Sequence, residues 1–204
     1  MNHSTRQTGR TVWVAARAMI LLTALLGIVY TCAVTGAGQL LLPWQANGSI
    51  VSNASGDPVG SALIGQRFDD ADGAPLPEYF QPRPSAAGNG YDGGASSGSN
   101  LGPENADLVS AIDDRLDAVS LLNGVPRSAV PADAVTASAS GLDPHISPEY
   151  AAIQIDRVAE ARGIASDAVA AAVREHTRGP ALGYLGESTV NVLELNVALD
   201  DLED

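Results

Sequence analysis

The sequence predicts a single N-terminal transmembrane helix followed by a small α/β (α+β) extracytoplasmic domain. Three observations favour this fold class. Residues 18–56 contain no charged side chain, and residues 18–42 are mostly apolar. The three arginines of the first 56 residues precede this apolar segment, whereas all 24 acidic residues follow it. Beyond the segment, apolar side chains occur at both helical and strand-like spacings.

The apolar segment has the length and the flanks of a membrane-spanning helix. As an α-helix, the 25 residues 18–42 extend about 37 Å, which exceeds the roughly 30 Å of a bilayer's hydrocarbon core. Trp13 and Trp44 lie just beyond its ends, where indole rings favour the headgroup region. Because the arginines come first, the positive-inside rule predicts a cytoplasmic N-terminus. We therefore expect residues 1–11 in the cytoplasm, 12–42 as the transmembrane helix with its flanks, and 43–204 outside.

Two alternatives concern the same segment. Small residues at 35–38 are typical of a signal-peptide cleavage region, but the apolar stretch before them is longer than the usual core of about 7–15 residues. A lipoprotein would use Cys32, although Thr31 precedes it where a smaller residue is usual. We therefore favour an uncleaved anchor.

One face of the expected helix carries small side chains. Thr23, Gly27, Thr31 and Thr35 recur at every fourth position, which places them on one side of a helix. Small residues at this spacing allow a second helix to approach closely within lipid. Glycine and threonine are also common in membrane helices, so a purely structural interpretation stays open. The functional hypothesis is that this face packs against partner helices.

The part of the body nearest the anchor is expected to be a hairpin followed by loop. Residues 49–52 and 59–66 flank a turn at 53–58, and this pattern predicts a β-hairpin. Residues 69–102 show no regular spacing. Within them, the glycine-rich segment 88–102 contains six glycines, too many for a regular element.

Helices are expected in the second half of the body. Residues 105–123 place apolar side chains at helical spacing, and Gly124 ends that helix. Ser147 and Pro148 are typical of a helix start, which predicts a helix that stops at Gly163.

Two further segments complete the expected fold. We expect another helix over residues 166–178, before the glycine and proline that follow. Residues 190–199 fit either a strand or a helical face, and we favour the helix.

The composition excludes several classes of function. All 11 basic residues are arginine, so the chain lacks the lysine of a Walker-type phosphate loop and of a Schiff-base enzyme. A single cysteine rules out an internal disulfide, and three scattered histidines predict no metal site. Residues 57–204 hold eight arginines and 24 acids, a net charge of −16, which opposes nucleic-acid binding.

Two short motifs fall within the glycine-rich segment. Residues 88–93 match G-x-G-x-x-G, and residues 94–98 match G-x-S-x-G. Each motif needs a preceding strand and a following helix, the first to bind a dinucleotide and the second to expose a nucleophilic serine. The flanking residues predict loop instead. A membrane-anchored extracytoplasmic serine hydrolase using Ser96, with Asp143 and His145 following in hydrolase order, stays the alternative function.

Two histidines have simpler structural interpretations. Asp143 to Ser147 read DPHIS, which predicts a turn in which Asp143 bonds nearby backbone. His176 falls near the end of an expected helix, where the dipole favours a cation. Neither position requires a catalytic role.

Six blocks of the sequence are similar to one family, in that family's order. They read LLGIVYTCAVTGAGQLLLPWQANGS, VGSALIGQ, YFQPRPSAAG, SNLGP, VTASASGLDPHIS and VNVLELNVALD. Together they extend over nearly the whole chain. The sequence therefore resembles the KdpC subunit of the bacterial potassium-transporting Kdp P-type ATPase.

The resemblance implies a single-pass accessory subunit in the plasma membrane of a bacterium. Its partners would be a channel-like potassium-binding subunit, a P-type ATPase subunit, a very small membrane peptide and the lipid bilayer. The family is thought to stabilise the assembly, and a catalytic chaperone role that raises the pump subunit's ATP affinity has been proposed for it. We expect no catalytic residue and no tightly bound cofactor, with ATP and potassium acting at the level of the complex.

A direct contact with ATP conflicts with a body outside the cytoplasm. Backbone N–H groups of a glycine-rich segment are nevertheless able to cradle phosphate. On that ground the nucleotide-binding candidates are Ser96, Gly98, Ser99 and Asn100. The family often carries two adjacent glycines in this stretch, whereas this chain has Ser96 and Ser97 before Gly98.

Overall fold

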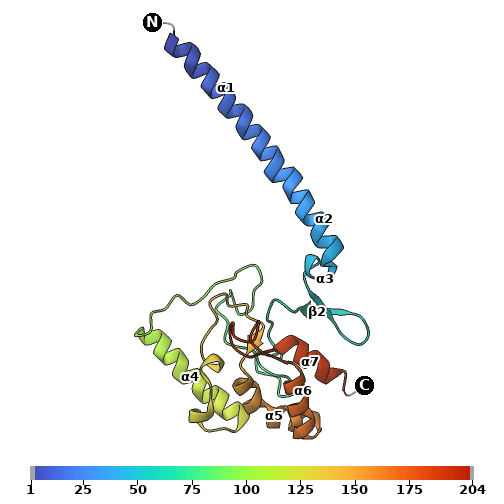
Figure 1. The fold of residues 1–204 in the computed structure, drawn as a ribbon. Coiled ribbons are helices and arrows are strands. Elements are labelled where there is room, and N and C mark those ends of the chain that lie inside the picture. The colour runs from blue at the N-terminus through green and yellow to red at the C-terminus, as the bar shows by residue number, and fades with distance from the viewer. Residues whose placement is uncertain (1–2, 203–204) are drawn as a thin grey trace. The chain divides into compact units, whose positions relative to one another are not determined.

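A computed structural model describes residues 3–202, which form two compact units (Figure 1). The units are Met1–Ser49 and Ile50–Asp204, and we call the second the body. The first unit is helical, and the body combines helices with two small antiparallel sheets. The predicted fold class, one N-terminal apolar helix followed by a small α/β domain, is therefore confirmed.

The first unit contains the expected apolar helix. Three segments follow one another directly: α1 (His3–Ala24), the π-helical η1 (Leu25–Tyr30) and α2 (Thr31–Leu41). Within them, Thr8–Leu41 is long and apolar enough to cross a membrane, judged by length and composition. Leu42 has a non-helical backbone with a φ of −138°, because a proline disfavours the α-helical conformation in the residue before it. Pro43 then begins the short α3 (Pro43–Ala46).

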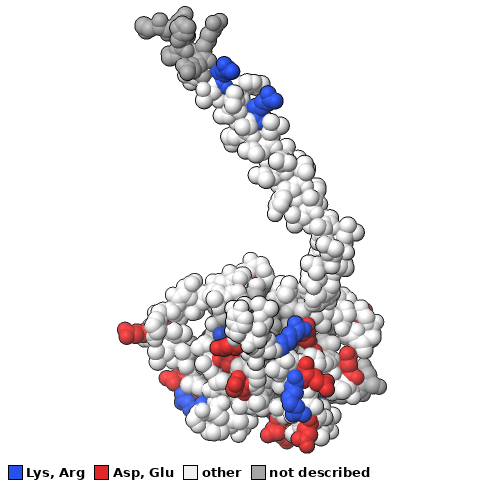
Figure 2. Space-filling model, in the orientation of Figure 1, with Lys and Arg blue, Asp and Glu red and all other residues white. Residues whose placement is uncertain are grey.

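Charge is distributed along the chain as the sequence predicts. Figure 2 shows the helix free of acidic side chains, with basic side chains only near its start. Acidic side chains are scattered over the visible face of the body (Figure 2). The helix surface is thus suited to an apolar medium and the body surface to water.

The predicted hairpin is confirmed, although its second strand is shorter than expected. β1 (Ile50–Ser52) pairs antiparallel with β2 (Pro58–Ser61), and Ile50 lies opposite Ser61. The Asn53 side chain accepts a hydrogen bond from the Asp57 N–H at 2.9 Å and closes the turn. The second strand ends at Ser61 rather than at residue 66, because a turn follows in which the Ile64 N–H bonds the Ser61 carbonyl.

The two helices with clear start and stop signals form where they were predicted. In α4 (Ala106–Asn123), the Asn105 side chain caps the first turn and Gly124 ends the helix with a φ of +64°. In α5 (Pro148–Arg162), the Ser147 hydroxyl accepts from the Tyr150 N–H and Gly163 ends the helix in the same way. Two short 3₁₀ segments lie between them, η2 (Arg127–Ala129) and η3 (Ala132–Ala134).

A three-stranded sheet corrects the predicted end of the next helix. α6 (Ser166–Glu175) stops three residues before position 178, because β4 (Thr177–Arg178) pairs with β5 (Thr189–Asn191). β3 (His145–Ile146) pairs with the other edge of β5, which gives the antiparallel order β3-β5-β4.

The favoured helix at 190–199 is confirmed, with a short strand at its start. β5 supplies that strand, and α7 (Val192–Asp200) follows it directly. The Asn191 side chain accepts from the Glu194 N–H at 3.1 Å and caps α7. Residues 62–105, between β2 and α4, form no helix or strand in the described structure and are called the long loop. One hydrophobic core joins α5, α6 and α7 to the sheet, and Phe80 from the long loop is fully buried in it.

Candidate functional site

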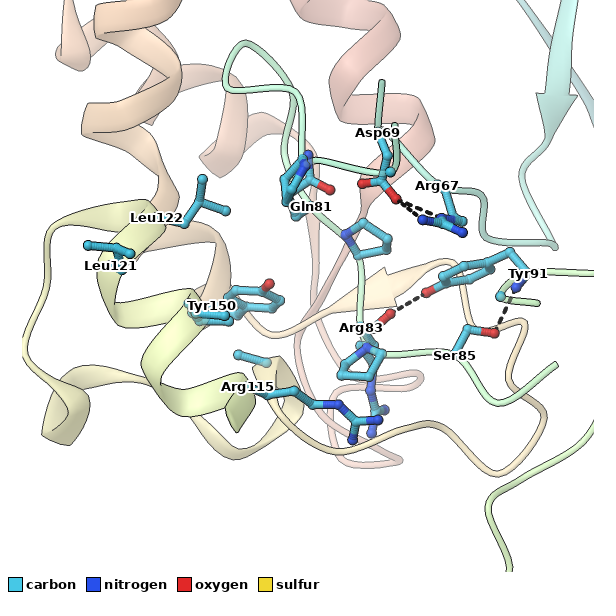
Figure 3. Close-up of a pocket in the computed structure, with 18 of the residues that line it drawn as sticks. Arg67, Asp69, Gln81, Arg83, Ser85, Tyr91, Arg115, Leu121, Leu122 and Tyr150 are labelled. Atoms are coloured by element: carbon cyan, nitrogen blue, oxygen red, sulfur yellow. Dashed lines mark hydrogen bonds and ion pairs between the residues drawn. The ribbon is translucent and has the colours of Figure 1, made fainter. Parts of the chain in front are cut away.

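A cavity of the body, which we call the main cavity, lies between the long loop and α4 (Figure 3). Its volume is about 890 Å³, within the range of sites that hold small molecules. The loop 67–91 supplies one wall, and α4 supplies much of the other. The residues labelled in Figure 3 are Arg67, Asp69, Gln81, Arg83, Ser85, Tyr91, Arg115, Leu121, Leu122 and Tyr150.

Two buried amides fix the loop wall although it has no regular structure. The Asn196 side chain accepts a hydrogen bond from the Phe80 N–H at 2.8 Å and donates one to the Phe80 carbonyl at 3.0 Å. The Gln154 side chain does the same for Gln81, at 2.7 Å and 3.2 Å. Each side-chain amide therefore bonds the backbone N–H and carbonyl of one loop residue, as a neighbouring β-strand would, and satisfies these groups away from water.

The Gln81 side chain ties the loop to itself. Its amide nitrogen donates to the carbonyls of Phe68 at 2.9 Å and Leu76 at 3.1 Å. Arg157 of α5 adds hydrogen bonds to the Tyr79 carbonyl at 3.0 Å and to the Gln154 side chain at 2.8 Å. The loop wall is consequently held from α5, from α7 and from within.

A second set of contacts positions the far end of the loop. The Tyr91 hydroxyl donates to the Arg83 carbonyl at 2.9 Å, and the Ser85 hydroxyl accepts from the Tyr91 N–H at 2.8 Å. The Ser85 hydroxyl also donates to the Gly141 carbonyl at 2.5 Å. Burial raises the pKa of Tyr91 far above its ordinary value, so this phenol stays protonated as the donor.

Arg83 connects the loop to the predicted turn at 143–147. One of its terminal nitrogens lies 3.3 Å from the Asp143 carboxylate, and the other donates to the Thr136 carbonyl at 3.3 Å. Asp143 in turn accepts from the His145 N–H at 3.0 Å, as the turn prediction requires. Burial alone would raise the pKa of Asp143, but hydrogen bonds from His145 and the Arg83 charge together lower it.

The four nucleotide-binding candidates lie in irregular backbone outside this cavity. The Ser96 hydroxyl donates to the Ser140 carbonyl at 3.0 Å, and the Ser97 N–H donates to the same carbonyl at 2.9 Å. A Cβ on Gly98 would approach the Ala139 carbonyl to 3.0 Å. Asn100 bonds back to the Gly98 carbonyl at 3.2 Å, and Ser99 lies between them. The segment is therefore packed against residues 138–141.

The same geometry bears on the hydrolase alternative. Residues 81–105 contain no helix or strand in the structure as described, so Ser96 lacks the strand-to-helix turn that exposes a nucleophile. Asp143 and His145 contact one another at 3.3 Å, whereas the Ser96 hydroxyl is directed to the Ser140 carbonyl. The structure thus assembles a turn from these residues and gives no support to a triad.

The described residues show no group of three or more His, Cys, Asp or Glu side chains able to hold a metal ion. Several acidic side chains instead pair with arginine. Arg127 bonds Asp113 at 2.7 Å and Asp117 at 3.0 Å, and Arg67 bonds Asp69 at 2.6 Å. These carboxylates have arginine partners.

The small-residue face runs across the π-helical segment. Thr23 belongs to α1, Gly27 to η1, and Thr31 and Thr35 to α2, and all four are exposed. In a regular α-helix, residues four apart drift by about 40° per step, which would place Thr35 about 120° from Thr23. A π-turn holds more residues than an α-turn, so η1 offsets part of this drift. The four positions therefore lie closer to one line than the sequence alone implies.

Gly27 is not required by the chain's own packing. A Cβ built on Gly27 meets nothing within 4 Å, and its φ lies outside the left-handed region. Gly36, on the same helix, has equally open surroundings. A larger side chain at either position is thus compatible with the isolated helix.

Sequence reasoning did not single out the residues of the main cavity. Arg115 and Tyr150 lie within two predicted helices, where their spacing carries no special signal. The sequence signal for the cavity is the block YFQPRPSAAG, which contains Phe80 to Arg83 and supports the family resemblance without indicating a cavity. The cavity depends on contacts between residues more than 70 positions apart, such as those between Gln81 and Gln154.

The fold defines this protein as a small α/β domain preceded by one helix of membrane-spanning length and composition. A family model described as "KdpC: K+-transporting ATPase, c chain" matches residues 12–201. The chain therefore belongs to the KdpC family.

Curated relatives agree with this assignment. A Potassium-transporting ATPase KdpC subunit from Kineococcus radiotolerans is 55% identical over 181 residues, which cover 89% of this chain and 88% of the relative. One from Caulobacter vibrioides is 52% identical, with 89% and 88% covered. One from Mycobacterium tuberculosis is 50% identical, with 90% and 94% covered. The sequence resemblance is thus confirmed over most of the chain.

Proposed function

We propose that this chain is an accessory subunit of an ATP-driven potassium-uptake complex, which it assembles and stabilises. Its partners in this proposal are a channel-like potassium-binding subunit, a P-type ATPase subunit and a small membrane peptide. Family membership over residues 12–201, and relatives named as subunits of a potassium-transporting ATPase, support a role within a larger complex. The absence of lysine means that this chain cannot carry a P-loop or the phosphorylation motif of the pump subunit.

The observation that carries the proposal is the exposed apolar helix. The segment Thr8–Leu41 buries none of its apolar window within the chain, so lipid or other helices must cover it. Gly27 lies on this surface with open space around it. Gly27 also lies in line with the small side chains of Thr23 and Thr31, so this face allows the close approach of a partner helix.

The same proposal places the N-terminus in the cytoplasm and the body on the outer face of the bacterial plasma membrane. Arg6, Arg10 and Arg17 precede the uncharged apolar stretch 18–42, and positive residues favour the cytoplasmic side. Cys32 in α2 is the sole cysteine of the sequence, so its replacement gives a background in which one introduced cysteine reports the orientation of the chain. In a Cys32→Ala background, Ser55→Cys should react with an impermeant maleimide in intact cells. A label that appears only after cell lysis would contradict this orientation.

With the body outside, the catalytic chaperone effect must be indirect. We propose that the subunit raises the ATP affinity of the P-type subunit by favouring one conformation of the complex, because ligand affinity follows the population of the competent state. Residues 96–100 then need not touch nucleotide. The apparent KM for ATP should increase when the subunit is removed from the purified complex, and Ser96→Ala should leave that KM unchanged.

Substitution at Gly27 tests the assembly role. Gly27→Leu should reduce co-purification of the other subunits with the tagged chain, because the larger side chain blocks close helix packing. Gly36→Leu is the matched control: it is the same change on the same helix, about 100° round the axis from Thr35. Equal recovery of the partners with both variants would count against the proposed face. Both variants should insert into the membrane normally, since neither leucine meets another group of the chain.

A further inference from the structure

The cavity beside α4 has features of a ligand site that the assembly role does not require. We propose that it binds an amphipathic organic anion, whose carboxylate or phosphate group contacts Arg115 and whose apolar body lies against α4. The proposal concerns the body alone and does not depend on the partners of the helix.

Two arginine side chains that line the cavity bond to consecutive backbone carbonyls. Arg115 donates to the Val135 carbonyl at 3.0 Å, and Arg83 donates to the Thr136 carbonyl at 3.3 Å. These carbonyls belong to consecutive residues, so both guanidinium groups are anchored on the same short stretch of chain; Figure 3 shows the two side chains. The Asp143 carboxylate offsets the charge of Arg83, so Arg115 leaves a local excess of positive charge.

Within the described part of the chain, Arg115 has no carboxylate partner although the body is rich in acidic residues. Among the same residues, its single hydrogen bond goes to the Val135 carbonyl. By contrast, Arg157 makes hydrogen bonds to the Asn123 and Gln154 side chains and to loop carbonyls. A guanidinium has five N–H donors, so Arg115 retains donors for an anion.

A further donor, the Tyr150 hydroxyl, is available in the same cavity. The side chain of Tyr150 is buried, with 3% of the residue exposed, and its hydroxyl has no hydrogen-bond partner among the described residues. The Nε atom of Arg83 is buried and likewise lacks a partner in the described chain. The Tyr150 hydroxyl oxygen is accessible at the cavity, so an anion there would accept its hydrogen bond. Burial raises the pKa of Tyr150, so its hydroxyl remains a donor.

The rest of the cavity is suited to an apolar group. Val119 and Leu122 of α4 form one side, and Pro82 and Pro84 form part of the loop wall. The remaining charged pair, Arg67 and Asp69, is joined at 2.6 Å and adds no net charge. A ligand that places its charge on Arg115 and its apolar body between these walls matches both surfaces.

Binding of a rigid aromatic carboxylate tests the proposal. The full chain in lipid nanodiscs is titrated with naphthoate by calorimetry, and empty nanodiscs supply the background. We expect saturable binding that Arg115→Gln weakens about tenfold, as loss of a charged hydrogen bond does. Tyr150→Phe keeps the buried ring, so it should fold normally and still weaken binding. Arg174→Gln, an equal change of charge on the exposed face of α6, is the matched control and should bind as the wild type does.

Three other probes define the ligand class. Naphthyl phosphate should bind as naphthoate does, inorganic phosphate should bind more weakly because it lacks the apolar body, and neutral naphthalenemethanol should bind more weakly because it lacks the charge. Equal affinity for naphthalenemethanol and naphthoate would overturn the anion assignment. Equal affinity for naphthoate in Arg115→Gln and Arg174→Gln would overturn the role of Arg115. Binding that disappears in the assembled complex would overturn the small-molecule assignment, since a partner segment would then occupy the cavity.

Discussion

Asn196 of α7 holds both backbone polar groups of Phe80, a residue 116 positions earlier in the chain. The contact is fully buried, and it anchors an otherwise irregular loop to the helical core. Since a side-chain amide both accepts and donates, few other residues can replace it. Asn196 is therefore one of the anchors of the loop wall, together with Gln154 and Arg157 of α5.

Loss of that amide should be strongly destabilising. Asn196→Leu leaves the Phe80 N–H and carbonyl buried without partners, which should lower the free energy of unfolding by about 3 kcal/mol. Both tryptophans, Trp13 and Trp44, lie in the first unit, so near-ultraviolet circular dichroism of the body's tyrosines is the suitable probe. A cost below about 1 kcal/mol in urea denaturation would show that the loop is held mainly by other contacts.

An aspartate at position 196 should make the protein more stable relative to wild type at low pH than at high pH, whereas most acidic residues of folded proteins stabilise at high pH. Ionised Asn196→Asp accepts from Phe80 but cannot donate, and burial raises the pKa of such a carboxyl. Once protonated, the carboxyl regains a donor, so the variant should become more stable relative to wild type as pH falls from about 8 to about 5. Urea midpoints that shift equally for both proteins would refute this mechanism.

Gly141 and Gly163 have the same backbone conformation but different surroundings, so alanine substitutions at the two positions separate the cost of steric overlap from the cost of backbone strain. Their φ values are +67° and +66°, but a Cβ on Gly141 would lie 2.6 Å from the Ser97 carbonyl oxygen, whereas one on Gly163 meets nothing within 4 Å. Gly163→Ala should cost about 1 kcal/mol for the left-handed backbone alone. Gly141→Ala should cost about 2 kcal/mol more, because the backbone at Ser97 and at Ala87 must move away. Equal unfolding free energies would mean that this backbone is not packed on residue 141.

Asp143 should contribute stability that is lost in acid. Its pKa in the folded body is lowered, despite the opposing effect of burial, by hydrogen bonds from His145 and by Arg83. A group of this kind stabilises the fold above its unfolded-state pKa, about 3.9, and the contribution disappears as pH falls through the lower folded-state pKa. Wild type should therefore lose more stability than Asp143→Asn between about pH 5 and about pH 2. Parallel losses in the two proteins would contradict the ion-pair role.

Ser96→Ala separates the assembly role from the hydrolase alternative. The substitution removes one exposed hydrogen bond to the Ser140 carbonyl, which should cost at most about 1 kcal/mol. Potassium uptake at low external potassium should be unchanged. A variant that folds normally but loses a hydrolytic activity of the purified chain would favour the hydrolase.

Elements with local signals could be predicted from the sequence, and elements set by distant contacts could not. Asn105 and Ser147 cap their helices through side chains adjacent in sequence, and Gly124 and Gly163 end them, so both helices formed as expected. The end of α6 was wrong because Thr177 pairs with Val190, a contact that helical spacing does not reveal.

The candidate sites show the same division. The turn at Asp143 was predictable because its hydrogen bond to the His145 N–H is local. The cavity was not, because Arg115 and Tyr150 line a common cavity only when Asn196 and Gln154 hold the loop in place. The π-turn in the apolar helix also had no sequence signal.

The central claim is that this chain works as a subunit of a larger potassium-transporting assembly. The most direct test is affinity purification of the tagged chain from potassium-starved cells in mild detergent, followed by an ATPase assay. The account predicts recovery of a P-type ATPase and a channel-like protein, together with ATPase activity. Recovery of the chain alone, without ATPase activity, would contradict it.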